Sequence, residues 1–366
     1  MYRRLLLLSG LAIFAVVCNH AAGFGQIGLF LWADRYRPVT SPNWDQLGTT
    51  SSFVLLAVRQ IGVFSVPAFL FVSGFFVSYA ALDKRNPLGW GFVRARLSSL
   101  LPPYLIWSVV LIAGDVLQGD PRPPGEYLIL LATQGVVGPF YFLPLLIYSC
   151  LLSPIVARLL QWNWKLILSC SAAIQFATVA NAYLGLARPD LAWVQLIASL
   201  TPSWLPFQWI FFFTLGMCAG FHVDDLRQWL LKRDVILSCM VVLALLANII
   251  EADAILRSRR YWGAYNGTAT FNLYAVALIF WFLARAAIPG AHQLTELGSR
   301  SYGIYLTHYP FIGFTARLVR RIWPQLLAYP IVFVPALVVV GLAGPLVLMA
   351  GVRRTALKGS YRYLFG

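Results

Sequence analysis

Residues 5–24 read LLLLSGLAIFAVVCNHAAGF, a run of twenty residues that contains no Asp, Glu, Lys or Arg. An α-helix of that length is about 30 Å long, which matches the hydrocarbon core of a bilayer. Arg3 and Arg4 before the run would also suit a signal peptide, but His20 inside it favours a membrane-spanning helix. This run sets the expectation for the rest of the chain.

Apolar runs of comparable length recur along the chain of 366 residues, which is 60% hydrophobic and 11% charged. Because ordinary soluble proteins carry about 25% charged residues, this composition excludes a soluble enzyme. We expect an all-α, polytopic membrane protein in which residues 1–366 form a single transmembrane domain, without a separate soluble domain. About ten spans are predicted, at residues 5–24, 53–81, 98–117, 140–160, 165–186, 204–221, 234–251, 269–288, 301–317 and 328–351.

The distribution of Lys and Arg predicts how the spans are oriented. Assigning the joints between spans alternately to two sides gives net charges of +12 and +2, with the N-terminus on the more positive side. By the positive-inside rule, the N- and C-termini should both be cytoplasmic. The cluster of Arg317, Arg320 and Arg321 falls on the opposite side and fits this scheme least well.

The net charge of +15 and the five cysteines do not indicate nucleic-acid binding, a metal site or a disulfide framework. Lys and Arg stand singly or in small groups in the joints, which suits membrane anchoring better than binding to nucleic acid. The cysteines all lie inside apolar runs, without a close Cys pair or clustered His. We therefore expect no metal site and no disulfide framework.

Three ionisable side chains are expected at a similar depth within the spans, where such groups are costly and mark functional sites. Helical rise puts His20 roughly 22 Å from the cytoplasmic edge and Arg59 roughly 9 Å below the outer edge. Asp115, on the third span, reaches a similar level. His20 could serve as a general base and Arg59 could stabilise an oxyanion, with Asp115 as a third candidate. Hydrogen bonding between helices and snorkelling to headgroups would explain His20 and Arg59 without chemistry.

A fourth ionisable residue, His308, lies about 10 Å into the ninth predicted span. This position belongs to the inner half or the middle of the membrane, so we do not expect His308 to touch His20. A structural or pore-lining role is predicted for it.

Five local sequences, in chain order, carry a family resemblance. They are SGLAIFAVVCNH (9–20), VPAFLFVSGF (66–75), RARL (94–97) followed by LPPY (101–104), YFLP (141–144) and LGSRSYGIYLTH (297–308). On these strings the chain resembles acyltransferase family 3, the integral-membrane O-acyltransferases that modify extracytoplasmic sugars. Each string alone is weak, but together they extend over most of the chain.

The resemblance implies a donor, acyl-CoA (acetyl-CoA being the expected one), that approaches from the cytoplasm. It also implies a hydroxyl acceptor on an extracytoplasmic or lipid-linked carbohydrate, and His20 as the catalytic residue. Arg85, Arg94 and Arg96 are candidates for binding the donor phosphates, although membrane anchoring explains these charges equally well. Pore-lining or structural roles are expected for Ser73, Tyr141, Tyr305 and His308.

Two positions depart from the family pattern. The family usually has an arginine eleven residues before the histidine, where this chain has Ser9. It also usually has an arginine three residues after the position of Arg96, where this chain has Ser99. Both departures are expected on the cytoplasmic side, so they affect the donor site rather than His20.

The sequence therefore predicts a membrane O-acyltransferase of the O-acetyltransferase type, acting in polysaccharide modification of the cell envelope. It is expected in the bacterial inner membrane, with the lipid bilayer, acyl-CoA and a glycan acceptor as partners and with no bound cofactor. The oligomeric state is left open. A transporter or flippase of a polysaccharide intermediate is the alternative, because the same buried groups could line a path.

Overall fold

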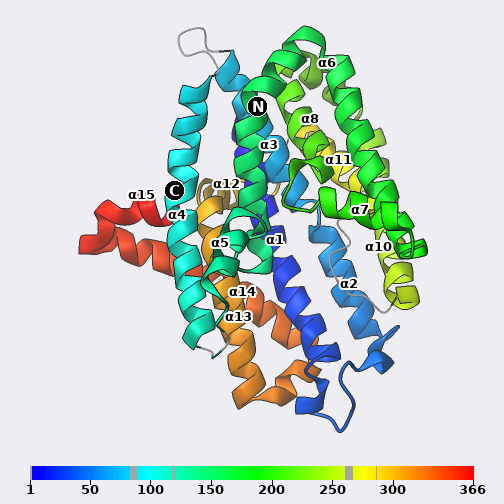
Figure 1. Ribbon diagram of the computed structural model, residues 1–366, viewed down its shortest axis with the longest axis vertical. Helices are drawn as coiled ribbons and strands as arrows, with labels where there is room; N and C mark the ends of the chain where they lie inside the picture. Colours follow the sequence, from blue (N-terminus) through cyan, green and yellow to red (C-terminus); the bar gives the residue numbers. More distant parts are fainter. Residues whose placement is uncertain (1, 83–88, 118, 120, 260–266, 286) are drawn as a thin grey trace.

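The computed structural model describes residues 2–82, 89–117, 119, 121–259, 267–285 and 287–366 (Figure 1). Within these residues the chain is helical and has no β-strand, which confirms the all-α prediction. The helices are α1 (Tyr2–Phe30), α2 (Thr50–Gly62), α3 (Ser65–Ala81), α4 (Trp90–Leu117), α5 (Pro124–Ala132), α6 (Phe142–Ala187), α7 (Ala192–Leu200), α8 (Ile210–Phe221), α9 (Val223–Leu231), α10 (Asp234–Arg259), α11 (Ala269–Ala284), α12 (Ala291–Ser299), α13 (Ser301–Ile322), α14 (Pro330–Arg354) and α15 (Tyr361–Phe365).

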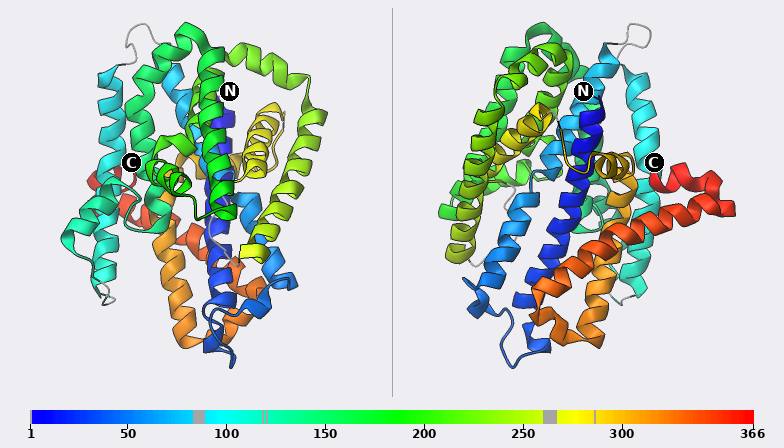
Figure 2. Two further views of the ribbon diagram at one scale, coloured as in Figure 1. Left: turned by 45° about the vertical axis from the view of Figure 1, so that its right-hand side comes forward. Right: turned by 180° about the vertical axis from the view of Figure 1, so that it is seen from behind.

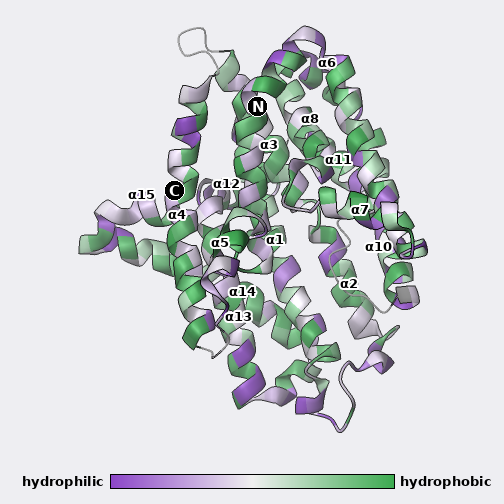
Figure 3. Ribbon diagram, in the orientation of Figure 1, coloured by the Kyte–Doolittle hydropathy of each residue, from purple (hydrophilic) through white to green (hydrophobic). Residues whose placement is uncertain are grey.

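Hydrophobic residues dominate the long helices, as Figure 3 shows, and the chain is a multi-pass integral membrane protein. Each of the ten predicted spans overlaps a helix, and the span 53–81 overlaps two, α2 and α3. The number of crossings and the side on which the termini lie stay predictions. Six of the described segments are long and apolar enough to cross a bilayer: Tyr2–Phe30, Thr50–Ala81, Trp90–Leu117, Gly138–Ala187, Asp234–Ser258 and Pro330–Arg354.

The helix α6 is a hairpin of two helical arms, whose bend lies near the top of Figure 1. Asn163 interrupts the helix with φ −154° and ψ 89°. Its side-chain Oδ1 accepts a hydrogen bond from the backbone N–H of Leu166 at 3.1 Å. An asparagine that satisfies a free N–H in this way caps the start of a helix. The predicted spans 140–160 and 165–186 correspond to the two arms.

The N-terminal helix α1 lies in the centre of the bundle and packs against α2, α3, α12, α13 and α14. Viewed from behind, α14 crosses α1 obliquely (Figure 2). In the most apolar part of α1, 67% of the residues are buried inside the protein, against 17% for α10. The helix α10 is therefore available to lipid, whereas α1 is placed to line internal cavities.

Glycines allow the helices to approach closely at two contacts. A Cβ added to Gly74 of α3 would lie 2.1 Å from the carbonyl oxygen of Phe213, and one added to Gly216 of α8 would lie 2.0 Å from that of Phe71. On the other side of α1, a Cβ at Gly298 would lie 2.0 Å from the carbonyl oxygen of Leu6. Lipid supplies little driving force for helices to associate, so close packing across small residues holds such bundles together.

Candidate functional site

A cavity of about 570 Å³ lies between α1, α2, α6 and α13, and two ionisable side chains form part of its wall. They are His20 of α1, which is half-buried, and Arg59 of α2. The structure thus brings together the two residues that the sequence predicts at one depth. The other polar residues of the wall are Asn19, Gln60, Ser65, Tyr141, Ser203, Gln208, Tyr305 and Tyr309.

His308 of α13 is a direct neighbour of His20. The centroids of the two imidazole rings are 5.3 Å apart, and the next residue, Tyr309, sets its ring edge-on to His20 at 5.5 Å. The expectation that His308 lies away from His20 is therefore wrong. Gly298, just before α13, contacts Leu6 of α1, so α13 begins well along α1 rather than level with its first residue. This offset carries His308 to the depth of His20.

The ring of His308 is held in one orientation. The side chain is 0% exposed, and Nδ1 lies 2.7 Å from the carbonyl oxygen of Tyr305 and 3.1 Å from that of Ile304. Since a carbonyl oxygen only accepts hydrogen bonds, Nδ1 carries the proton and the neutral ring leaves Nε2 as an acceptor. That buried Nε2 has no hydrogen-bond partner among the described residues.

Arg59 is fixed by polar groups of α1. Its Nη1 donates a hydrogen bond of 2.5 Å to Oε1 of Gln26, and its backbone carbonyl accepts one of 3.0 Å from Nδ2 of Asn19. Gln26 is 0% exposed. These contacts hold the cation beside the cavity and keep it from snorkelling to the headgroups, which favours a role in the site.

A second cavity, of about 480 Å³, lies on the side of the N-terminus, between α1, α3, α4, α13 and α14. Three arginines form part of its wall, Arg96 of α4, Arg300 before α13 and Arg353 of α14. Ser9 and Ser99, which stand where the resembled family has arginines, line the same cavity. Arg300 and Arg353 therefore give this cavity positive charge that Ser9 and Ser99 do not provide.

Two of these arginines are oriented by neighbouring side chains. Nη2 of Arg300 lies 2.8 Å from a carboxylate oxygen of Glu296, and the guanidinium of Arg353 lies 4.3 Å from the ring centroid of Tyr361. Three cations against one carboxylate give this wall an excess of positive charge. Guanidinium groups in such a setting bind phosphate through paired N–H donors.

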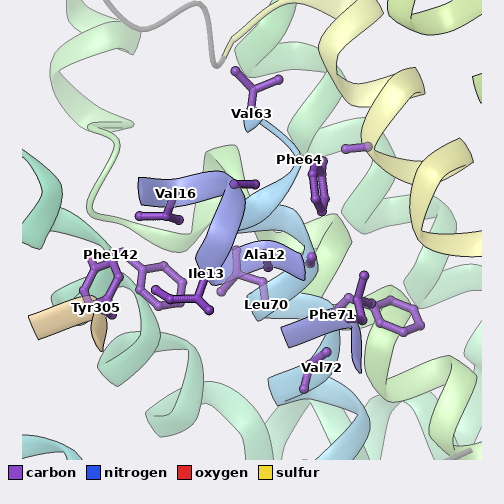
Figure 4. Close-up of a cluster of buried hydrophobic side chains, with 14 of the residues drawn as sticks. Ala12, Ile13, Val16, Val63, Phe64, Leu70, Phe71, Val72, Phe142 and Tyr305 are labelled. Atoms are coloured by element: carbon purple, nitrogen blue, oxygen red, sulfur yellow. The ribbon is translucent and has the colours of Figure 1, made fainter. Parts of the chain in front are cut away.

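Two aromatic residues, Phe142 and Tyr305, line both cavities. Their rings meet edge to face with centroids 5.4 Å apart, and Figure 4 shows them side by side, next to Ile13 of α1. They are 5% and 4% exposed. The Tyr305 hydroxyl donates a hydrogen bond to the carbonyl oxygen of Pro139. The two rings thus form a thin partition between the cavities, which we call the Phe142–Tyr305 partition.

The remaining predicted site residues divide into those near the cavities and those elsewhere. Ser73 lines the second cavity, and Tyr141 lines the first. Asp115, near the end of α4, lies in the wall of neither, and the exposed Arg94 does not line the second. Arg85 lies outside the described residues. Within the described residues, no three His, Cys, Asp or Glu side chains are grouped so that they could hold a metal ion.

Several polar residues of the site were not singled out from the sequence. Asn19, Gln26 and Gln60 are uncharged, and Tyr309 is aromatic, so a search for ionisable groups in apolar runs passed over them. A signal did exist, because the amides of Gln26 and Gln60 lie inside apolar helices, where an unpaired polar group is costly. Both side chains are at most 1% exposed.

A family model described as an acyltransferase domain matches residues 5–349, which is nearly the whole chain. The match includes the whole wall of the first cavity and most of the wall of the second, in which Arg353 lies just beyond it. Comparison with curated proteins and with solved structures finds no match.

Proposed function

Because the chain belongs to the family of the acyltransferase domain matched at residues 5–349, we propose that this membrane acyltransferase moves an acyl group from acyl-CoA to a carbohydrate hydroxyl. The acyl group is acetyl and the acceptor is an extracytoplasmic or lipid-linked glycan of the cell envelope. The protein lies in a bacterial inner membrane, with its termini on the cytoplasmic side.

The observation that carries this proposal is the pair of cavities that share the Phe142–Tyr305 partition. A transferase acting across a membrane needs a donor site and an acceptor site that meet at one point. The cavity beside the N-terminus has three arginines, and the other has His20 and Arg59. The donor therefore belongs in the second cavity, which has the three arginines, and the acceptor hydroxyl belongs in the cavity of His20.

The donor site depends on Arg96, Arg300 and Arg353. Their guanidinium groups suit the phosphates of coenzyme A, and the thioester end of the donor then extends toward the Phe142–Tyr305 partition. Arg300 and Arg353 supply the charge that Ser9 and Ser99 do not. We therefore assign donor binding to these three residues, in place of the set that includes Arg85 and Arg94.

The chemistry takes place at His20. Its neutral imidazole takes the proton of the acceptor hydroxyl as the hydroxyl oxygen attacks the thioester carbonyl carbon. The guanidinium of Arg59 stabilises the oxyanion that forms on the carbonyl oxygen. The carbon–sulfur bond then breaks, and the thiolate of coenzyme A recovers the proton from His20. The products are the O-acyl sugar and free coenzyme A.

The test is acyl transfer from radiolabelled acetyl-CoA to endogenous glycans in membranes that contain the wild type, His20→Ala or His292→Ala. His292 is an exposed histidine of α12, which makes it a matched control. We expect labelled glycan with the wild type and His292→Ala, and none with His20→Ala at equal expression. Label that survives in His20→Ala removes His20 from catalysis. Glycan transport without acyl-CoA, and no label in any sample, contradicts the transferase and supports the transporter.

A further inference from the structure

Four arginines surround a third cavity, of about 440 Å³, at the end of the bundle away from Tyr2. Three of them, Arg317, Arg320 and Arg321, come from the last turns of α13, whose lower end is hydrophilic in Figure 3. The fourth, Arg35, belongs to the short 3-10 helix Ala33–Arg35 that follows α1. Pro324 completes the wall. We call these four residues the arginine cluster.

The charge of the arginine cluster is little compensated. Asp34 lies 3.9 Å from Nε of Arg35, and no Asp or Glu lines the cavity among the described residues. The sequence has no acidic residue after Glu296. Four guanidinium groups around one cavity repel one another, and an anion between them would relieve that repulsion.

Membrane anchoring does not explain the position of the cluster. The helix α1 runs from Tyr2 to the end that carries Arg35, so the cluster lies opposite the N-terminus. On the predicted orientation this end is extracytoplasmic, where the positive-inside rule disfavours Lys and Arg. The cluster therefore calls for another role.

A neighbouring aromatic ring orients one of the four arginines. The guanidinium of Arg320, a half-buried residue, stacks on the ring of Trp32 at 4.9 Å. Nη1 of Arg317 folds back along α13, since it lies 3.1 Å from where a Cβ of Gly313 would be, with the ring of Phe24 beside that point. Groups oriented before a ligand arrives lose less entropy when they bind it.

The same helix links the cluster to the cavity of His20. The ring of Phe24 lies 5.7 Å from that of Tyr309, which contacts His20. From Tyr309 to Arg320 the axis of α13 rises about 17 Å. A short saccharide whose phosphate is bound at the cluster could thus place one of its hydroxyls at His20.

We propose that the arginine cluster binds the phosphate or diphosphate group that joins the carbohydrate acceptor to its lipid. This inference rests on the proposed function and adds that the acceptor is lipid-linked and is held by its phosphate while a sugar hydroxyl enters the cavity of His20. Guanidinium forks match phosphate oxygens, and the membrane end of α13 places them at headgroup depth. The other source of the same chemistry is the headgroup of an ordinary anionic phospholipid.

The test measures binding of farnesyl diphosphate, an amphiphilic diphosphate, to the full-length protein in phosphatidylcholine nanodiscs. The variant is Arg320→Gln with Arg321→Gln. The control is Arg227→Gln with Lys232→Gln, which removes two exposed charges from α9 and the residue after it. We expect the variant to lose about tenfold in affinity and the control to keep it. Equal affinity in the variant overturns the proposal.

Two further measurements distinguish a lipid-linked acceptor from a phospholipid headgroup, and the phosphate site from catalysis by His20. Nanodiscs doped with phosphatidylglycerol leave farnesyl diphosphate binding unchanged if the cluster is an acceptor site, whereas competition by phosphatidylglycerol overturns it in favour of a headgroup site. His20→Ala is expected to bind farnesyl diphosphate as the wild type does. The binding measurement can therefore contradict the phosphate site without contradicting acyl transfer by His20, and the reverse. Single Arg321→Gln, at an exposed residue, repeats the measurement without removing the Trp32 contact.

Discussion

The imidazole rings of His20 and His308, from the two helices α1 and α13, lie 5.3 Å apart. Two backbone carbonyls fix the Nδ1–H of His308, and its Nε2 is left as a buried acceptor beside His20. That Nε2 has no partner among the described residues, and a small approach of the two rings would let it accept a hydrogen bond from His20 and hold that ring in one tautomer, as the carboxylate does in a hydrolytic triad. We infer that His308 is a positioning residue for His20.

Replacing His308 with asparagine separates this role from packing. The amide N–H of Asn can replace the Nδ1–H donor to the Tyr305 carbonyl, while the acceptor at Nε2 is lost. We expect His308→Asn to keep the wild-type melting temperature in detergent and to lower kcat by about tenfold or more. The pH profile of kcat should shift, whereas KM for acyl-CoA should not. An unchanged kcat and pH profile would leave His308 with packing alone.

Arg59 should contribute to the transition state rather than to binding. We expect Arg59→Met to lower kcat by about a hundredfold, because one donor to an oxyanion is lost, with KM for the donor little changed. Gln26→Leu removes the side chain that receives the Arg59 hydrogen bond and should cause a smaller loss of the same kind. Steady-state acyl transfer measures both variants. A rise in KM with constant kcat would assign Arg59 to substrate binding.

The Phe142–Tyr305 partition should limit access of water to the thioester. Phe142→Leu keeps the site apolar but leaves a gap beside Tyr305. We expect it to raise release of coenzyme A in the absence of acceptor relative to acyl transfer, as a thiol assay would record. Phe75→Leu, at a buried position that lines neither cavity, is the matched control. Equal uncoupling in both variants would point to a general loosening of the fold.

The arginines of the second cavity should govern affinity for the donor. Arg353→Gln and Arg300→Gln are each expected to raise KM for acyl-CoA by about tenfold with little change in kcat, because each loses a charge-assisted contact to phosphate. Arg94→Gln, at the exposed residue outside that cavity, is expected to behave as the wild type. A comparable rise in KM for Arg94→Gln would return donor binding to the set predicted from the sequence.

The contact between α3 and α8 should tolerate no side chain at Gly216. Gly216→Ala sets a methyl group 2.0 Å from the Phe71 carbonyl oxygen, so the helices must separate, at about 1–3 kcal/mol. We expect a lower melting temperature in detergent. Gly351→Ala, in α14, meets nothing within 4 Å and should be neutral or slightly stabilising. Equal melting temperatures for the two variants would contradict this account of the bundle.

Apolar run length was enough to locate the long apolar helices, because a membrane helix must satisfy its own backbone hydrogen bonds and covers its length with apolar residues. It also placed a joint between residues 160 and 165, where Asn163 separates the two arms of α6. It could not show that the predicted span 53–81 holds two helices, α2 and α3, since both are apolar and the break between them needs only local backbone geometry. The pairing of His20 with Arg59 was anticipated from depth, because the two spans carrying them are joined by one loop and cross the bilayer in opposite directions.

The neighbour of His20 on α13 was missed for a different reason. Depth was counted from the first apolar residue of each span, as though all spans began at one level. Gly298 instead packs against Leu6, and this contact shifts α13 along α1. Such axial offsets are set by packing between helices distant in sequence, so apolar run length does not encode them.

The helix α1 sets the distance and the relative rotation between the residues that it contributes to the two cavities. Ser9 lines the second cavity and His20 the first, and the eleven steps between them rise about 17 Å in just over three full turns, so both residues share one face. Inserting a single residue between them would rotate one against the other by about 100°. Substitutions within this segment can therefore be absorbed locally, whereas a change in its length would turn His20 away from its cavity relative to Ser9.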